Sequence, residues 1–337
     1  MVTAAPRTVT RARIASIATY LPPKLLTNAD LEKMVETTDE WILQRTGIRE
    51  RHIAEPGVGT SDLAKEAALG ALRQAGISPD QLGFIVVGTT TPDTIFPSTA
   101  CMLQHKIGAH HAWGFDLGAA CSGFTYAVTT GMQLVATGAH DYVLAVGADV
   151  MSSIIDYTDR TTCVLFGDGA GAVVLSAAED DEPHIIDFAA EIDGSGGPAL
   201  CMPAGGSRMP ASHETVDKRL HYVKQDGATV FKFAVKKTEE ICRRVLERNG
   251  LTSADLDLFV SHQANRRIIA AAAERLSLPE ERVVINLEMY GNTTAATIPL
   301  ALADAMRQGR LKKGDLVLLT SVGAGFTVGA VLLRWSL

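Results

Sequence analysis

Short apolar runs rich in β-branched residues alternate along this chain with longer segments whose apolar residues recur at helical spacing. Residues 65–88, KEAALGALRQAGISPDQLGFIVVG, show the unit: an amphipathic helix, a glycine stop, a short acidic-capped segment and a strand. Strands that alternate with helices in this way predict an α/β protein. We expect mixed, largely parallel strands that are buried on both faces of their sheets.

The same order of elements occurs twice. Residues 239–262 repeat the pattern of residues 65–88 at an offset of 174 positions, so that Gly88 matches His262. Later segments correspond in the same order: 115–123 to 285–293, 141–149 to 315–323, and 169–176 to 327–335. The repetition predicts two similar halves, 1–178 and 179–337, and the Gly-, Pro- and Met-rich region 193–225 is expected to be an inserted loop.

Composition narrows the class of protein. The chain has 337 residues, of which 47% are hydrophobic and 20% charged, enough for one large core or two fused halves. A net charge of −7 argues against a general nucleic-acid surface. The five cysteines include no C-x-x-C pair, which favours free thiols in a reducing compartment. With no signal-peptide pattern and no apolar run of membrane-spanning length, the sequence predicts a soluble cytoplasmic protein.

Cys121 lies in FDLGAACSGFTYAV, where an apolar strand gives way to a helix. Phe124, Val128 and Met132 follow it at helical spacing, so we expect the cysteine at the N-terminus of a buried helix. The helix dipole and free N–H groups there stabilise a thiolate and lower its pKa. The competing interpretation is a small buried hydrophobic side chain, as most free cysteines are. The other four cysteines lack this setting and are assigned to packing.

Two polar residues of the second half also follow strand ends. His262 ends the run DLFVS and precedes a helix, which is where open α/β sheets place their sites. Asn292, in EMYGNTTAAT, occupies the place in the second half that Cys121 holds in the first. Each alone has an ordinary structural explanation, a hydrogen-bonded histidine or a Gly-Asn turn. Their coincidence with Cys121 at strand ends of a duplicated fold favours one shared site.

These motifs together resemble β-ketoacyl-acyl carrier protein synthase III, the initiating condensing enzymes of bacterial fatty acid synthesis, which have the thiolase fold. The resemblance runs from ARIASIATYLP to the C-terminus and includes TTDEWILQRTGIRERHIA, GAACSGF, TDRTTCVLFGDGAGAVVL, FVSHQANRRI, YGNTTAATIPLAL and GAGFTVGAVLLRW. It implies a layered αβαβα fold made of two duplicated mixed-sheet halves.

The resemblance implies a role for each candidate. Cys121 accepts the acyl group, and His262 and Asn292 donate hydrogen bonds to a thioester carbonyl. The backbone N–H groups of Cys121 and Ala324 form the oxyanion hole, with Ala324 replacing the middle glycine of the family's tail. The implied reaction joins an acyl-CoA starter, such as acetyl-CoA, to malonyl-acyl carrier protein with loss of CO₂. The thioester of coenzyme A is a substrate, and no metal or redox cofactor is implied.

Binding residues follow from the same resemblance. Coenzyme A contacts are expected at Trp41, Arg45, Arg160 and Asn265; the acyl pocket at Met151, Phe166, Leu200 and Val223, closed by Phe96 of the other subunit of a homodimer; and the docking site of the acidic acyl carrier protein at Lys232, Arg266, Arg267 and Arg275, with Lys236 and Lys237 nearby. The bulky pocket residues suggest a short starter, acetyl or branched.

Two alternatives remain open. One is an acyltransferase of secondary metabolism, or a quinolone-type condensing enzyme, that loads the same cysteine but serves another acceptor. The other is a catalytically silent binding or scaffold subunit. The motif SHQANRRI and Trp41 favour the fatty-acid role over the first, and the intact cysteine, histidine and asparagine argue against the second.

Overall fold

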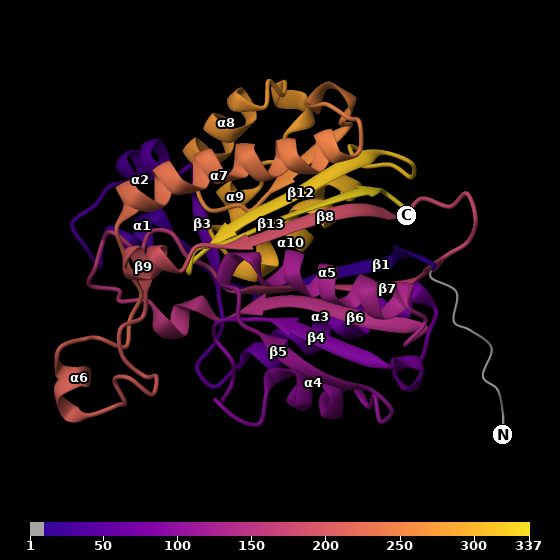
Figure 1. Ribbon diagram of the computed structural model, residues 1–337. Helices are drawn as coiled ribbons and strands as arrows, with labels where there is room; N and C mark the ends of the chain where they lie inside the picture. The colour runs from indigo at the N-terminus through magenta and orange to yellow at the C-terminus, as the bar shows by residue number, and fades with distance from the viewer. Residues whose placement is uncertain (1–9) are drawn as a thin grey trace.

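Two mixed β-sheets, each packed between helices, form the body of the protein in the computed structural model, which describes residues 10–337 (Figure 1). The first sheet has the strand order β1-β7-β6-β4-β5 and the second the order β11-β12-β13-β8. Their strands are β1 (Arg11–Tyr20), β4 (Phe84–Gly88), β5 (Trp113–Leu117), β6 (Tyr142–Asp149), β7 (Gly169–Ala178), β8 (Ile185–Ile192), β11 (Leu258–Ser261), β12 (Leu316–Gly323) and β13 (Thr327–Arg334). Two small sheets pair β2 (Lys24–Thr27) with β3 (Glu50–Ile53) and β9 (Leu200–Cys201) with β10 (Lys224–Gln225).

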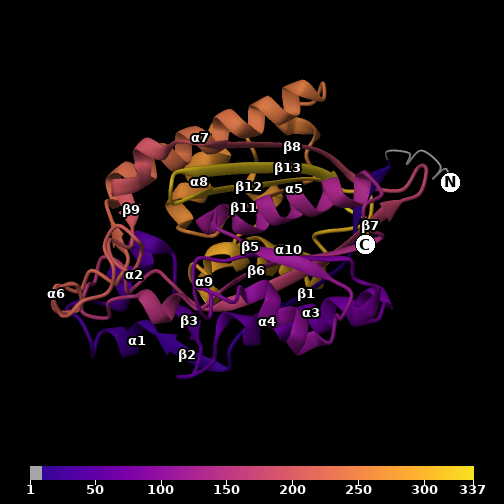
Figure 2. The same cartoon turned by 60° about the horizontal axis from the view of Figure 1, so that its bottom comes forward.

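The helices complete five layers (Figures 1 and 2). Helices α3 (Thr60–Ala75) and α4 (Thr99–Ile107) cover the outer face of the first sheet, and α7 (Gly227–Arg248) and α8 (Arg266–Arg275) lie outside the second. Between the sheets lie α5 (Gly123–Ala136) and α10 (Thr297–Arg307). The remaining short helices are α1 (Asn28–Leu31), α2 (Asp39–Thr46), α6 (His213–Asp217) and α9 (Leu287–Tyr290). This is the predicted αβαβα order.

The duplication is visible in the sheets themselves. Strands β1, β7, β6 and β4 correspond in order and relative direction to β8, β13, β12 and β11. Where the first sheet adds β5, the second has only an isolated bridge between Phe259 and Val283. The division at residues 178 and 179 falls between β7 and β8 and stays a prediction.

The expectation of largely parallel strands is wrong. Only the pairs β4/β5, β4/β6 and β11/β12 of the two main sheets are parallel in the described chain. The other four pairs are antiparallel, because β7 and β13 return along the strand that precedes them. Residues 324–326 join β12 to β13, and a connection so short permits only an antiparallel hairpin.

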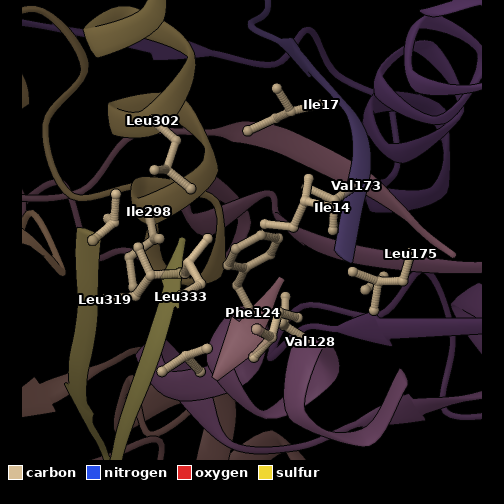
Figure 3. Close-up of a cluster of buried hydrophobic side chains, with 14 of the residues drawn as sticks. Ile14, Ile17, Phe124, Val128, Val173, Leu175, Ile298, Leu302, Leu319 and Leu333 are labelled. Carbon is tan, nitrogen blue, oxygen red and sulfur yellow. The ribbon is translucent and has the colours of Figure 1, made fainter. Parts of the chain in front are cut away.

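The two halves share one core between the sheets (Figure 3). Phe124 and Val128 of α5 pack there with Ile298 of α10, among side chains from the inner faces of both sheets. Truncating a fully buried phenylalanine such as Phe124 to alanine typically lowers the free energy of unfolding by about 3–5 kcal/mol. The shared core therefore holds the N-terminal ends of α5 and α10 rigidly with respect to each other.

Glycines allow α5 to approach the first sheet closely. A Cβ atom on Gly88, the last residue of β4, would lie 2.4 Å from the carbonyl carbon of Gly123. The start of α5 is thus pressed against the end of β4.

The region 193–225, predicted to be an insertion, contains β9, α6 and β10, and α6 projects from the body in Figure 1.

Candidate active site

A cavity of about 400 Å³ brings together the three residues that the sequence singled out. Cys121, His262 and Asn292 all line it, although they come from different strand ends. A smaller apolar recess of about 130 Å³ shares Cys121 with this cavity. The predicted acyl-pocket residues Met151, Phe166, Leu200 and Val223 line the recess.

Cys121 sits in a tight turn, Ala120–Ser122, directly before α5, and its side chain is buried. Burial raises the pKa of the Cys121 thiol to about 12, and the nearby charge of Asp149 acts in the same direction. The predicted lowering by the helix N-terminus is therefore wrong for this structure, because loss of hydration outweighs it. Burial therefore favours the thiol form of Cys121 over the thiolate.

The backbone around Cys121 is closely packed and leaves two N–H groups without a protein acceptor among the described residues. A Cβ atom on Gly323, at the end of β12, would lie 2.7 Å from the Cys121 nitrogen, so only glycine leaves room there. Residues 324–326 form the turn after Gly323. The hydroxyl of Thr327, at the end of this turn, donates to the carbonyl of Ala119 over 2.8 Å and so holds the turn next to Cys121. Within residues 10–337 the N–H groups of Cys121 and Ala324 make no hydrogen bond to another residue. Two free donors near the sulfur have the chemistry of an oxyanion hole.

His262 follows β11, and its backbone N–H donates to the Thr320 carbonyl over 2.8 Å. Its ring is buried, and Nδ1 lies 2.7 Å from the Thr297 hydroxyl. Burial lowers the pKa of His262 to about 3. The imidazole is therefore neutral at physiological pH, and a neutral ring has one N–H to donate and little tendency to release a proton.

Asn292 is held at both its backbone and its side chain. The backbone N–H donates to the Leu165 carbonyl over 2.8 Å, and the side-chain Oδ1 accepts from the Thr294 N–H over 2.9 Å. Because Oδ1 is occupied, the amide nitrogen Nδ2 is the group left to face a ligand.

The expected equivalence of Asn292 with Cys121 is wrong by three positions. The turns Ala120–Ser122 and Thr294–Ala296 both precede a helix of the central layer. Their first residues share a positive φ, 46° at Ala120 and 53° at Thr294. Ala295 is thus the counterpart of Cys121, and Asn292 precedes its turn.

The predicted coenzyme A contacts gather around α2 and the N-terminal end of α8. Trp41, Arg45 and Asn265 line the large cavity. The guanidinium groups of Arg45 and Arg160 lie 5.9 and 5.2 Å from the centre of the Trp41 ring, within cation–π range. Asn265 caps α8 through Oδ1 and donates from Nδ2 to the Arg45 carbonyl, which fixes α2 to α8.

Phe96 is the predicted pocket residue that the structure does not bring to the site of its own chain. Its side chain is 83% exposed, and it lines neither cavity. The recess also contains residues that the sequence analysis missed, including Ile154, Cys201 and Met202. Cys201 and Met202 follow a Gly- and Pro-rich segment in which no periodic pattern of apolar residues marks a buried position.

Ion pairs occupy much of the predicted basic patch. Carboxylates lie near Lys236 (Glu240, 3.6 Å), Lys237 (Glu191, 2.7 Å), Arg266 (Glu280, 3.9 Å) and Arg275 (Glu239, 2.9 Å). In the part of the chain that the structure describes, Lys232 and Arg267 have no such partner. The Arg267 guanidinium instead lies 5.8 Å from the centre of the Phe231 ring, and Phe231 lines the large cavity. The unpaired positive charge is therefore concentrated at Lys232 and Arg267.

Two features are absent from residues 10–337. These residues contain no group of three or more His, Cys, Asp or Glu side chains placed so that they could hold a metal ion. None of the helices combines the length and the apolar character needed to cross a bilayer.

Comparison with known proteins identifies the family. Residues 115–194 match the family model described as 3-oxoacyl-[acyl-carrier-protein] synthase III, and residues 246–335 match the model of its C-terminal part. Proteins named beta-ketoacyl-[acyl-carrier-protein] synthase III from Solibacter usitatus and Koribacter versatilis are 60% and 57% identical to this chain, each over 97% of this chain and 99% of the relative.

A solved structure agrees with these relatives. The crystal structure of 3-oxoacyl-[acyl-carrier-protein] synthase III from Aquifex aeolicus VF5 superposes with a TM-score of 0.89 at 44% identity, covering 96% of this chain and 100% of that one. The predicted fold class is thereby confirmed. Since the identity is high and extends over almost the whole of both sequences, the resemblance is confirmed as well, and the chain belongs to the β-ketoacyl-[acyl carrier protein] synthase III family.

Proposed function

We propose that this protein catalyses the decarboxylative condensation of an acyl-CoA starter with malonyl-acyl carrier protein, the first condensation of type II fatty acid synthesis, in the cytoplasm. The observation that supports this most strongly is the convergence of Cys121, His262 and Asn292 on one cavity that also reaches Trp41. The Cys121 thiol and the neutral donors of His262 and Asn292 suit thioester chemistry. Trp41, an aromatic residue of the same cavity, suits a long, polar carrier such as coenzyme A.

In the first half-reaction the Cys121 sulfur attacks the carbonyl carbon of the acyl-CoA. The carbonyl oxygen becomes an oxyanion, which the free N–H groups of Cys121 and Ala324 stabilise. The tetrahedral intermediate then collapses: the bond to the coenzyme A sulfur breaks, coenzyme A leaves with the proton from Cys121, and the acyl group stays on the cysteine. The nucleotide end of coenzyme A lies against Trp41 and Arg160, with Arg45 and Asn265 beside it.

In the second half-reaction malonyl-acyl carrier protein enters the same cavity. The bond between its carboxylate and Cα breaks, CO₂ leaves, and the electron pair moves into an enolate. His262 and Asn292 donate to the enolate oxygen, and because neither is acidic the carbanion is not quenched. The carbanion then attacks the acyl group on Cys121, the bond from the acyl carbon to the sulfur breaks, and the β-ketoacyl carrier protein is released. The Cys121 thiolate that leaves takes up a proton from solvent, which restores the thiol. Side chains and backbone amides perform every step, so no cofactor is needed.

The reaction can be tested with purified protein, malonyl-acyl carrier protein and a panel of acyl-CoAs. Because the recess measures about 130 Å³ and is lined by bulky residues, we expect acetyl-CoA and short branched starters to give the β-ketoacyl carrier protein, and long chains to give little. Mass spectrometry of the carrier protein, with CO₂ measured in parallel, reports the product. An acyl group transferred from Cys121 to another acceptor, with no condensation, would instead support the secondary-metabolism alternative.

The protein is proposed to act as a homodimer. Ile95 and Phe96 are 85% and 83% exposed, and β5, an edge strand of its sheet, exposes Trp113 and Phe115. Exposed apolar side chains beside an open strand edge are typical of an interface. We expect light scattering to give twice the chain mass at working concentration. A fully active monomer would contradict the assignment of Phe96 to the partner's recess.

The acyl carrier protein is proposed to dock on Lys232 and Arg267, beside the cavity mouth. Complementary charge mainly speeds encounter and is screened by salt. We therefore expect Arg267→Glu to weaken the carrier-protein half-reaction, and added salt to weaken that step in the wild type. Acetyl-CoA loading should change much less.

Arg275→Glu is the matched control for Arg267→Glu, because Arg275 already forms an ion pair with Glu239. The two half-reactions are measured separately as ionic strength is varied. Equal losses in both half-reactions of Arg267→Glu, or no loss in the carrier-protein step, would reject this docking site.

A further inference from the structure

The buried carboxylate of Asp149, in the first half, contacts the turn Thr294–Ala296 in the second half, next to the proposed donors His262 and Asn292. Asp149 ends β6, is 0% exposed, and its Oδ2 accepts a hydrogen bond from the Ala295 N–H over 3.2 Å. Its Oδ1 accepts from the Thr90 N–H over 2.7 Å, from the Thr91 N–H over 3.2 Å, and from the hydroxyls of Thr89, Thr90 and Thr91 at 2.9 to 3.0 Å. Asp149 thus joins the loop after β4 to the turn that begins at Thr294.

That turn contacts both proposed donors. The Thr294 N–H, one residue before Ala295, donates to Oδ1 of Asn292 over 2.9 Å. The Thr297 hydroxyl, two residues after Ala295, lies 2.7 Å from Nδ1 of His262. A shift of the turn would therefore displace the Asn292 amide and the His262 ring together.

The contact at Thr297 also bears on the tautomer of His262. The single hydroxyl proton has two acceptors within reach, His262 Nδ1 at 2.7 Å and the Thr294 carbonyl at 3.1 Å. Donation over the shorter distance makes Nδ1 an acceptor, and a neutral imidazole then carries its proton on Nε2. An Nε2–H is the form that a hydrogen-bond donor to an enolate oxygen needs.

We propose that Asp149 and Thr297 are positioning residues for the decarboxylation half-reaction: Asp149 fixes the turn Thr294–Ala296 and the start of α10 that follows it, and Thr297 fixes the Nε2–H tautomer of His262. This inference rests on the proposed donor roles of His262 and Asn292. Neither positioning residue touches the substrate.

Asparagine at position 149 cannot reproduce the contacts of the aspartate. The carboxylate accepts hydrogen bonds on both oxygens, whereas an asparagine has one acceptor oxygen and an NH₂ group. If that oxygen faces Thr90, the NH₂ group meets the Ala295 N–H, donor against donor. Misplacing a reacting group by about 1 Å costs on the order of 100-fold in rate. We expect Asp149→Asn to lower decarboxylation about 10- to 100-fold and to leave acetyl-CoA loading within about threefold.

Asp168→Asn is the matched control. Asp168 is equally buried at 0% exposure, and it accepts from the Ala54 and Ser152 N–H groups, neither of which belongs to the turn Thr294–Ala296. Both variants should unfold at a lower temperature, since each leaves buried donors unpaired. Only Asp149→Asn should lower the ratio of decarboxylation to loading, and an unchanged ratio would overturn the role of Asp149.

Thr297 supplies an independent test if Asp149→Asn does not fold. Thr297→Val keeps the shape of the side chain but removes the hydroxyl, so decarboxylation should fall, and Thr297→Ser should restore it. Nitrogen NMR of ¹⁵N-histidine-labelled protein, with His262 assigned through His262→Ala, should show the proton on Nε2 in the wild type and a shift toward Nδ1–H in Thr297→Val. A proton on Nδ1 in the wild type, or the same tautomer in both proteins, would overturn the role of Thr297.

Failure of this inference is distinguishable from failure of the proposed function. If His262→Ala and Asn292→Ala leave decarboxylation unchanged, the donor roles themselves are wrong. If those two variants lose decarboxylation while Asp149→Asn and Thr297→Val keep the wild-type ratio, only the positioning roles are wrong.

Discussion

Cys121→Ala is expected to abolish the acetyl adduct that acetyl-CoA leaves on the wild-type chain. Among the cysteines of residues 10–337, Cys121 is the one whose own backbone N–H belongs to the pair proposed to stabilise the oxyanion, so no other cysteine should accept the acyl group during turnover. Intact-mass measurement after incubation with acetyl-CoA should show one acetyl mass on the wild type and none on the variant. Condensation should be lost with the adduct.

Cys201→Ala is a demanding control for this result. Cys201 lines the same apolar recess as Cys121, so acetyl-CoA bound in the site brings its acyl group near both thiols. The Cys201→Ala variant should still gain one acetyl mass. An adduct retained by Cys121→Ala, or lost from Cys201→Ala, would refute the assignment of the nucleophile.

His262→Ala and Asn292→Ala should each lower decarboxylation about 100- to 1000-fold, the usual loss when one preorganised donor is removed. Release of labelled CO₂ from malonyl-acyl carrier protein measures this step, and acetyl-CoA loading is followed separately by mass. Loading should suffer less, because the oxyanion of that step is proposed to be held by backbone amides. Normal CO₂ release in both variants would show that the pair does not stabilise the enolate.

Gln263→Ala provides a neighbouring control. Gln263 is buried beside His262, but its side chain bonds to backbone groups of Ser261, Val284 and Asn286. Its removal should reduce stability and leave the ratio of the two half-reactions unchanged.

Because the pKa of His262 is about 3, the imidazole stays neutral above that pH, and the decarboxylation step should show no inflection near 6.5, where an ordinary histidine titrates.

The sequence predicted the features that depend on local pattern. The glycine stop at Gly76, the helical spacing after Cys121 and the strand before His262 are short-range signals, and the layered fold and the shared cavity agree with them. The repetition at 174 positions was also readable, because both halves keep the same order of helix, turn and strand.

What the sequence could not supply depends on contacts between distant segments. The pKa of Cys121 is set by burial under residues of the second half and by Asp149, so a local helix-end argument gave the wrong direction. The positive charge of Arg275 is neutralised by Glu239 of the neighbouring helix, which is 36 residues away in the sequence. Strand direction failed for a similar reason, since it follows from connections and not from the apolar runs themselves.

One pair of matching strand ends distinguishes the two halves at the proposed reaction centre. Strands β6 and β12 correspond in the duplication, and they end at Asp149 and Gly323. The carboxylate of Asp149 occupies the amide of the turn at Ala295, whereas Gly323 leaves the amide of the turn at Cys121 open. Of these two corresponding turns in the described chain, the one at Cys121 thus keeps its amide free for the proposed oxyanion hole. The proposed nucleophile Cys121 precedes β7 and the two proposed donors follow β8, so each of the two corresponding sheets lies in a half that holds only part of the proposed reactive set.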